Sequence, residues 1–303
     1  MKLTTYVMAM GVAAAALTGC QKVEPQTGTK LDTNEVVGDA CTPAADAATA
    51  AAADKTMQMT VSGKTIDVTS VTVIERPAEE VYFYADVKVA ANDTNAPAVI
   101  AGVIDALYSD ATDQKVATGD VTDVKGLVAQ LDSISKNFKD SVATDDVLNS
   151  VTKAFNVTVA AEPVAATDAY TTYKVYTNVF TGGAHPVYNV YFMTIGNDGT
   201  VYDFDSLIAN NEYRVAVKEA LVKTIAQSND LDVEKYLAQL NEFLSTSKED
   251  AIGVENFPVY NVGLTEQGLV FSYPQYSIGP ASDGVQLYAL PTEPLANILT
   301  IKL

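Results

Sequence analysis

The side chains best suited to nucleophilic or metal chemistry are scarce in this chain of 303 residues. It contains one histidine, His185, and two cysteines, Cys20 and Cys41. One imidazole and two thiols are too few for a zinc site built from three histidines, from four cysteines or from two of each. We therefore expect no metal centre, and no motif indicates another cofactor. The residue counts allow one catalytic Cys–His pair, Cys41 with His185. However, Cys41 lies in a polar, alanine-rich stretch far along the chain from His185.

Serine and carboxylate chemistry have little more support. The segments 133–136 and 245–248 each fit Ser-x-x-Lys, but that pattern fixes only two residues, and neither Ser-Asp-Asn nor Lys-Thr-Gly accompanies it. A serine triad would have to use His185, yet no Gly-x-Ser-x-Gly elbow is present. Carboxylates are abundant, and the separation that decides the chemistry of a pair is set by the fold. We predict no catalytic residues, with a hydrolase built on His185 or on a carboxylate pair as the alternative.

The most distinctive short segment is 181–186, which reads Thr-Gly-Gly-Ala-His-Pro. Gly182 and Gly183 allow backbone conformations closed to other residues and let another group approach closely. Pro186 favours an extended backbone at His185. The segment could present His185 to a ligand. Alternatively, it is a tight turn between strands in which His185 binds a backbone carbonyl.

Tyrosine is concentrated around the same segment and in the C-terminal tail. Its side chain combines a large contact area with a polar tip and is favoured at interfaces. A groove near the glycine pair could therefore hold a glycan or a protein strand. The residues that we predict to bind a partner are Gly182, Gly183, His185, Tyr188, Tyr273 and Tyr276. The alternative is that the tyrosines pack in the core and on sheet faces.

The elements that must position these residues come in separate runs of strands and helices. Period-two alternation predicts strands, and apolar residues three to four apart predict helices. A glycine between two alternating runs predicts a hairpin at 62–63, and residue types that tolerate positive φ predict one at 197–199. Such segregation defines an α+β class with mostly antiparallel sheets. The expected strands are 57–61, 66–73, 81–89, 155–160, 173–179, 187–195, 200–204, 257–264, 269–273 and 286–290, and the expected helices are 97–108, 126–149, 213–225 and 231–244.

The N-terminus has the pattern of a bacterial export signal. A basic start is followed by an apolar stretch too short to span a bilayer, and this stretch ends in Leu-Thr-Gly-Cys at 17–20. That ending resembles the bacterial lipobox, which implies cleavage before Cys20 and a lipid on its thiol. Gln21 follows in place of aspartate, which in enteric-type sorting implies the outer membrane. We expect a lipoprotein signal peptide at 1–19 and an anchor at Cys20; the alternative is an ordinary secretory signal.

Residues 20–55 form a low-complexity segment that we interpret as a disordered, lipidated tether. The segment is rich in alanine and has no apolar face to pack. No later segment is long and apolar enough to predict a membrane span. Once lipid occupies Cys20, Cys41 has no partner for an intrachain disulfide. The folded part must then be held together by its core alone.

Three sets of motifs in the second half of the chain carry a family resemblance. Gly-Gly-Ala-His at 182–185 is followed, after a strand and a hairpin, by Asp-Phe-Asp-Ser-Leu-Ile at 203–208. The tail adds Gly-Leu-Val-Phe at 268–271 and Tyr-Ser-Ile-Gly-Pro at 276–280. Together these motifs resemble the C-terminal extracytoplasmic domain of the RsiV-type anti-sigma factors. We therefore expect an RsiV-like α+β domain at 169–303.

The part of the chain before this domain is similar to the small α+β domain that precedes it in those proteins and in PdaC-type peptidoglycan deacetylases. We therefore expect a PdaC-like α+β domain at 56–168. The PdaC catalytic centre needs an aspartate and two histidines around a metal, which a chain with one histidine cannot supply. In the RsiV type the C-terminal domain binds lysozyme. This chain differs in having Pro186 where the family often has glycine, and in having no predicted transmembrane helix or sigma-binding segment.

The charge of the chain narrows the class of partner. Its net charge of −19 excludes nucleic acid, whose phosphates need a positive surface, and it suits a basic protein such as lysozyme. We expect a lipid-anchored envelope protein with a non-catalytic binding domain for a lysozyme-like protein or a peptidoglycan-related partner. The alternatives are an envelope hydrolase and a structural envelope protein that binds other envelope proteins.

Overall fold

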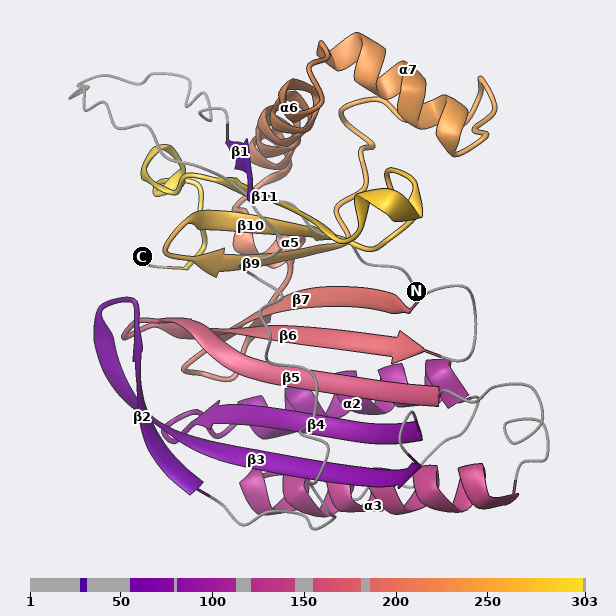
Figure 1. The fold of residues 1–303 in the computed structure, drawn as a ribbon. Coiled ribbons are helices and arrows are strands. Elements are labelled where there is room, and N and C mark those ends of the chain that lie inside the picture. The colour runs from indigo at the N-terminus through magenta and orange to yellow at the C-terminus, as the bar shows by residue number, and fades with distance from the viewer. Residues whose placement is uncertain are drawn as a thin grey trace. The chain divides into compact units, whose positions relative to one another are not determined.

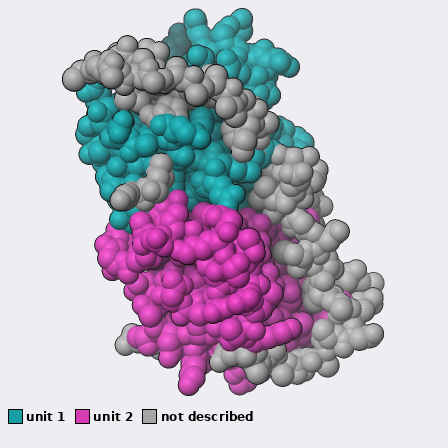
Figure 2. Space-filling view, turned by 90° about the vertical axis from the view of Figure 1, so that its left-hand side faces the viewer, with its two compact units in different colours: residues 1–36, 189–194, 201–303 teal, residues 37–188, 195–200 magenta. Residues whose placement is uncertain are grey.

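The computed structural model describes residues 28–31, 55–78, 81–112, 121–144, 155–180 and 186–301 (Figure 1). The chain divides into two compact units, which Figure 2 shows in separate colours. Unit 1 comprises Met1–Val36, Asn189–Thr194 and Val201–Leu303, and unit 2 comprises Val37–Tyr188 and Ile195–Thr200. Each unit combines helices with mostly antiparallel strands, so the expected α+β class is confirmed.

Unit 2 is built on a run of consecutive strands that follow one another in the sheet. They are β2 (Lys55–Val61), β3 (Lys64–Ala78), β4 (Val81–Ala90), β5 (Phe155–Ala166) and β6 (Tyr170–Phe180); next along the chain come β7 (Val187–Gly196) and β8 (Val201–Tyr202). The expected first hairpin is confirmed, with positive φ at Ser62 and Gly63. The second expected hairpin is confirmed by the turn at 197–199, where Gly199 has positive φ. Only the pair β4–β5 is parallel among the pairs β2–β3, β3–β4, β4–β5 and β5–β6.

The parallel pair requires a crossover, which two helices provide. Helices α2 (Ala96–Thr112) and α3 (Val124–Thr144) follow β4 in the chain and pack against strands β3, β4 and β5. Phe138 of α3 stacks on Phe155 with ring centroids 5.4 Å apart, and Tyr108 of α2 lies edge-on to Phe83 at 6.2 Å. All four rings are buried, so an aromatic cluster joins the helices to the sheet.

Unit 1 contains an antiparallel sheet of four strands in the order β1-β11-β10-β9. The strands are β1 (Thr29–Lys30), β9 (Asn261–Thr265), β10 (Gly268–Tyr273) and β11 (Gln286–Leu290). Helix α6 (Asn211–Ser228) packs against β1 and β11, and α7 (Val233–Phe243) packs against α6 (Figure 1). Every residue of β10 and β11 is buried, so these strands form the core of the unit. The short elements are α5 (Phe204–Leu207) and the 3-10 turns η2 (Ala281–Asp283) and η3 (Glu293–Leu295).

Side-chain caps fix where the helices of unit 1 begin. The Asn210 side chain accepts a hydrogen bond from the backbone N–H of Tyr213 at 3.0 Å, which caps α6. The Asp232 side chain accepts from the backbone N–H of Lys235 at 2.9 Å and caps α7. Helix α7 therefore starts at Val233, two residues later than expected, because its N-cap Asp232 has an extended backbone.

Two expected strands are shorter in the structure. The expected strand 200–204 ends at Tyr202 because Asp203 caps helix α5. The expected strand 257–264 begins only at Asn261, and Pro258, which has no N–H to donate to a sheet ladder, lies in the irregular part. The expected helix 126–149 is described only as far as Thr144.

One part of the expected tether is docked on unit 1. Strand β1 pairs with β11, and the N–H of Gly28 donates to Thr224 Oγ1 on α6 at 2.9 Å. A Cβ atom added to Gly28 would lie 2.0 Å from the carbonyl oxygen of Ala289. Only glycine allows this close approach to β11. A short stretch of the low-complexity segment is therefore an edge strand of the folded unit.

Candidate functional site

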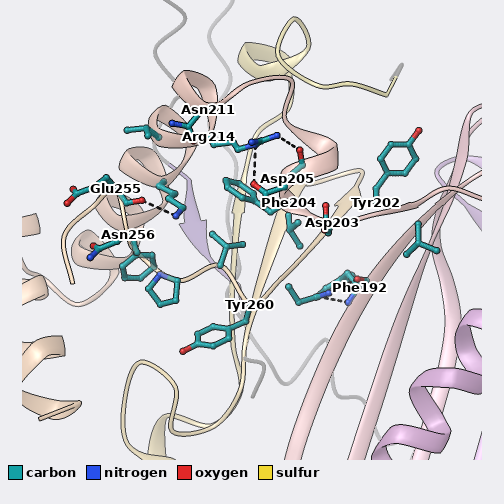
Figure 3. Close-up of a pocket in the computed structure, with 18 of the residues that line it drawn as sticks. Phe192, Tyr202, Asp203, Phe204, Asp205, Asn211, Arg214, Glu255, Asn256 and Tyr260 are labelled. Carbon is teal, nitrogen blue, oxygen red and sulfur yellow. Dashed lines mark hydrogen bonds and ion pairs between the residues drawn. The ribbon is translucent and has the colours of Figure 1, made fainter. Parts of the chain in front are cut away.

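Unit 1 contains a cavity of about 510 Å3 (Figure 3). It lies between the first turns of α6, the neighbouring β8–α5 segment and the irregular segment 255–260 that leads into β9. Its volume is in the range of about 300–1,000 Å3 that is usual for sites that bind small molecules. The charged lining residues are Asp203, Asp205, Arg214, Lys218 and Glu255, and the aromatic lining residues are Phe192, Tyr202, Phe204, Phe257 and Tyr260.

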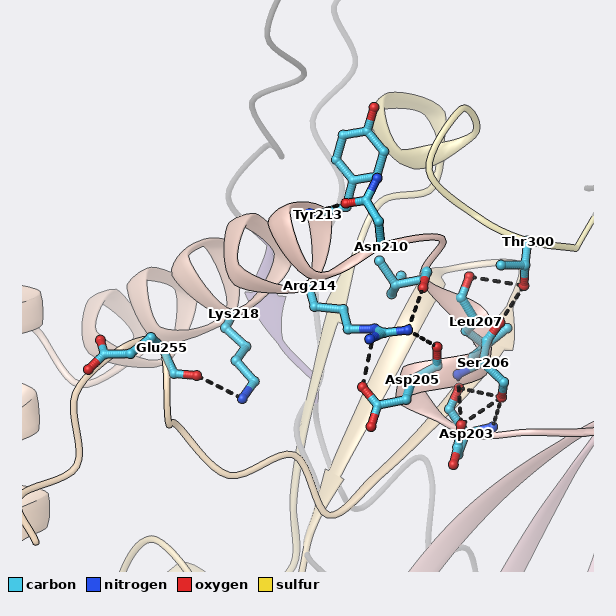
Figure 4. A network of polar contacts seen from close by, with 11 residues as sticks. Asp203, Asp205, Ser206, Leu207, Asn210, Tyr213, Arg214, Lys218, Glu255 and Thr300 are labelled. Atoms are coloured by element: carbon cyan, nitrogen blue, oxygen red, sulfur yellow. Dashed lines mark hydrogen bonds and ion pairs between the residues drawn. The ribbon is translucent and has the colours of Figure 1, made fainter.

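Arg214 joins helix α6 to helix α5 (Figure 4). Its Nη2 donates to the carbonyl oxygens of Asp205 and Ile208, the latter at 3.2 Å, and its Nε lies 3.2 Å from Asp205 Oδ1. These carbonyls lie at the end of α5, where helix carbonyls have no partner within the helix. One nitrogen of the guanidinium donates to both carbonyls, while Nε of the same rigid group faces the Asp205 carboxylate. Arg214 is therefore a clamp that holds one wall of the cavity in place.

Lys218 lies one turn after Arg214 on α6 and lines the same cavity. Its ammonium donates to the carbonyl oxygen of Glu255 at 3.0 Å (Figure 4). Burial lowers the pKa of Lys218 below its usual value, and the carboxylates of Asp205 and Glu255 act in the opposite direction. This lysine is half-buried, so part of its hydration is already lost before a ligand arrives.

The carboxylate of Asp203 is committed to the local structure of α5. Its Oδ1 accepts from the N–H and the hydroxyl of Ser206, at 2.8 and 2.6 Å, and the Ser206 hydroxyl accepts from the Asp203 N–H at 2.8 Å. This reciprocal pair is a capping box. The hydrogen bonds from Ser206 lower the pKa of Asp203, so this carboxylate is ionised at neutral pH.

The Asn261 side chain pairs with the backbone of Phe192, a lining residue of the cavity, as a neighbouring strand would. Asn261 Oδ1 accepts from the N–H of Phe192, and Asn261 Nδ2 donates to the carbonyl of Phe192, both at 2.8 Å. The Thr194 hydroxyl accepts from the N–H of Leu264 at 2.9 Å, and Ser272 donates to the carbonyl of Val190. These bonds attach the segment 189–194 to strands β9 and β10 within unit 1.

An aromatic cluster supports the irregular wall of the cavity. Tyr273 is fully buried, and its hydroxyl donates to the carbonyl of Pro258 at 2.8 Å. Its ring lies edge-on to Phe257 at 6.0 Å and to Tyr260 at 5.8 Å. Tyr260 itself is 39% exposed and lines the cavity. The cluster therefore presents one partly exposed ring on a rigid base.

The cavity combines an ammonium donor, aromatic surface and fixed walls, which is an arrangement for holding a polar ligand of small size. In the ranges that the structure describes, no three His, Cys, Asp or Glu side chains gather as metal ligands would. None of the helices in those ranges is long and apolar enough to cross a membrane.

The predicted site residues have several different locations. Cys20, Gly182, Gly183 and His185 lie outside the described residues. Tyr188 belongs to unit 2, where its ring centroid is 6.3 Å from that of Tyr176. Tyr273 is a core residue of unit 1 that supports the cavity from behind. Tyr276 of unit 1 is 46% exposed and has a positive φ of 69°. A binding role for these residues stays a prediction.

Sequence reasoning missed Arg214 and Lys218. Their spacing of four residues on an expected helix places both on one face, and this signal was available. The sequence did not indicate that this face would meet the motif at 203–208. That meeting depends on the Arg214 contacts with the end of α5.

The fold and the cavity define an α+β protein of two units, one of which carries a polar cavity of ligand size. Residues 205–293 match the model of a family described as a protein of unknown function (DUF3298). The chain therefore contains a DUF3298 domain, and this domain includes Arg214, Lys218 and the segment 255–260. No curated protein matches the chain.

Two solved structures share this fold. A DUF3298 family protein from Pseudomonas aeruginosa PAO1 is 16% identical, with a TM-score of 0.51, and the match covers 82% of this chain and 95% of that one. A DUF3298 family member from Bacteroides fragilis is 14% identical, also with a TM-score of 0.51, and the match covers 82% of this chain and 94% of that one. At these identities the similarity concerns the fold alone.

Proposed function

We propose that this protein is a lipid-anchored binding protein of the cell envelope, and that the cavity of unit 1 binds a saccharide fragment of the cell wall. The observation that carries the ligand proposal is the cavity itself, with Lys218, Tyr202 and Tyr260 in its lining. Saccharides are bound by aromatic faces together with a few placed polar groups, and the cavity offers both. The resemblance to RsiV-type and PdaC-type domains supports a cell-wall context.

A small ligand fits these observations better than a protein partner does. A stable protein interface usually buries about 800 Å2 on each partner, which far exceeds the mouth of a cavity of this volume. Lysozyme remains a competing candidate because its positive charge complements a chain at −19. Complementary net charge alone speeds encounter without specifying a binding site.

The proposed anchor is Cys20, and it gives unit 1 a definite reach. Gly28 comes eight positions after Cys20, and an extended chain spans at most about 3.6 Å per residue. Unit 1, docked through β1, is therefore held within about 30 Å of the outer-membrane surface that Gln21 implies. Labelling of cells with radioactive palmitate tests the anchor: the chain takes up label, and a Cys20→Ala variant does not. Label on that variant, or none on the parent, contradicts the anchor.

The ligand proposal is tested by calorimetry with the full-length chain in detergent. We expect saturable binding of muramic-acid-containing disaccharide at micromolar to millimolar concentration and no change in the sugar on recovery. Binding of lysozyme without binding of sugar would favour a protein partner, and release of sugar products would favour the hydrolase alternative. Binding of neither, with cross-links only to other envelope proteins, would favour a structural role.

A further inference from the structure

Lys218 is a cation of the cavity lining whose ammonium has unused hydrogen-bond donors. An ammonium has three N–H donors, and one of them is given to the Glu255 carbonyl at 3.0 Å. Within the part of the chain that the structure describes, its other two donors meet no further hydrogen-bond acceptor of the protein. Because Lys218 is half-buried in the cavity lining, an incoming acceptor would replace water there at a reduced desolvation cost.

The other charged groups of the lining are differently engaged. Arg214 directs its guanidinium at the end of α5 and at Asp205. Asp203 is tied to Ser206 by the capping box. Asp205 and Glu255 are exposed at the rim, where their charges would repel a ligand with several negative groups. The lining therefore suits a ligand with a single negative charge placed at Lys218.

We propose that the cavity selects a saccharide bearing one carboxylate, and that Lys218 is the residue that recognises this carboxylate. The inference rests on the proposed function, since it names the chemical class of the same ligand. A charge-assisted hydrogen bond between an ammonium and a carboxylate is shorter and stronger than a neutral one. N-acetylmuramic acid has this chemistry, because it is N-acetylglucosamine with a carboxylate-bearing lactyl ether.

The surrounding side chains fit the neutral part of such a ligand. Tyr260 is partly exposed on its aromatic base, and Tyr202 lies on the β8 side of the same cavity (Figure 3). Asn211 is an exposed amide at the start of α6. Aromatic faces pack against sugar C–H groups, and amides exchange hydrogen bonds with hydroxyl and acetamido groups.

The test compares three disaccharides that differ only at one position. They are N-acetylglucosaminyl-N-acetylmuramic acid, its methyl ester, and N,N′-diacetylchitobiose (chitobiose below), which lacks the lactyl group. Calorimetry on the full-length chain should show about ten- to a hundred-fold tighter binding of the acid than of the ester or chitobiose, the range expected for a hydrogen bond to a charged group. The preference should weaken as salt rises.

Variants assign the preference to Lys218. Lys218→Met should bind all three sugars about equally, whereas Lys218→Arg should keep a preference for the acid. Lys223→Met is the matched control, because it removes the same charge from an exposed position of α6 outside the lining, and it should behave like the parent. If Lys218→Met fails to fold by circular dichroism, the ester comparison and Lys218→Arg still decide.

Three failures can be told apart. Equal binding of acid, ester and chitobiose by the parent would overturn carboxylate recognition and leave the proposed function standing. Absence of binding to all three would overturn the proposed function itself. An acid preference that persists in Lys218→Met would show that another group recognises the carboxylate.

Discussion

Replacing Arg214 by methionine should loosen the wall between α5 and α6 far more than neutralising its acidic neighbour does. Nη2 of Arg214 donates to the carbonyls of Asp205 and Ile208, and the arginine side chain is only 28% exposed. The Asp205 carboxylate in the ion pair is 76% exposed. The clamp therefore depends on the carbonyl contacts, and the ion pair contributes little.

The magnitudes separate the two contributions. A hydrogen bond from a charged donor contributes roughly 1.5–3 kcal/mol, so two of them set an upper limit near 6 kcal/mol. Partial exposure lets water replace part of this, and we expect Arg214→Met to lower the free energy of unfolding of unit 1 by about 2–3 kcal/mol. A pair with so exposed a carboxylate contributes at most about 1 kcal/mol, which bounds the effect of Asp205→Asn. Arg214→Lys should fall between them, at about 1–2 kcal/mol, because it keeps the charge and loses the planar fork.

Urea denaturation followed by circular dichroism measures these losses. Hydrogen exchange on peptides covering 203–214 assigns them to unit 1, because protection should fall at α5 and at the start of α6 in Arg214→Met. Equal destabilisation by Asp205→Asn and Arg214→Met would instead make the ion pair the main contact and rule out the carbonyl clamp.

Three further perturbations test other parts of the account. Gly28→Ala should detach β1 and raise hydrogen exchange at 28–31, while costing under about 2 kcal/mol because the freed residues regain entropy; unchanged exchange would contradict the close approach to Ala289. Asn261→Ala should destabilise unit 1 by about 1–3 kcal/mol, since it leaves both backbone groups of Phe192 without a partner; Asn261→Asp should cost at least as much, because its second carboxylate oxygen would face the Phe192 carbonyl, and a smaller loss would contradict the arrangement. Burial raises the pKa of Glu162, but the ammonium groups of Lys174 and Lys88 outweigh this and hold its pKa below 4.5. Its contribution to stability is therefore present above pH 4.5 and lost as pH falls through the lower, folded-state pKa. In Glu162→Gln the free energy of unfolding, measured by urea denaturation, should therefore fall less steeply with decreasing pH than in the parent. An unchanged pH dependence would contradict this.

Much of the fold of unit 2 follows from local patterns in the sequence. The alternation of 81–89 predicts a strand, and Phe83, Ala85 and Val87 are buried on one face of β4. Gly63 between two alternating runs indicates the hairpin, because glycine tolerates the positive φ that this turn requires. Such signals are predictable because each one lies within a few residues of the structure that it determines.

The site was harder to predict because its parts come from distant segments. The segment around Pro258 is apolar, as in a strand. However, the Tyr273 hydroxyl donates to the Pro258 carbonyl, and proline has no N–H to pair with a neighbouring strand. The alternation pattern contains neither effect. Gly28 looked like part of a featureless tether, and only its contact with β11 distinguishes it. The tyrosine cluster was likewise ambiguous, since Tyr273 is buried and Tyr276 is exposed only three residues later.

Binding of a cell-wall saccharide in the cavity of unit 1 can be observed residue by residue. The most direct measurement is an amide chemical-shift titration of the isotope-labelled full-length chain with N-acetylglucosaminyl-N-acetylmuramic acid. We expect saturable shifts concentrated at residues 202–205, 211–218 and 255–262, which line or frame the cavity. Shifts that do not saturate, or that fall mainly outside these segments, would contradict it.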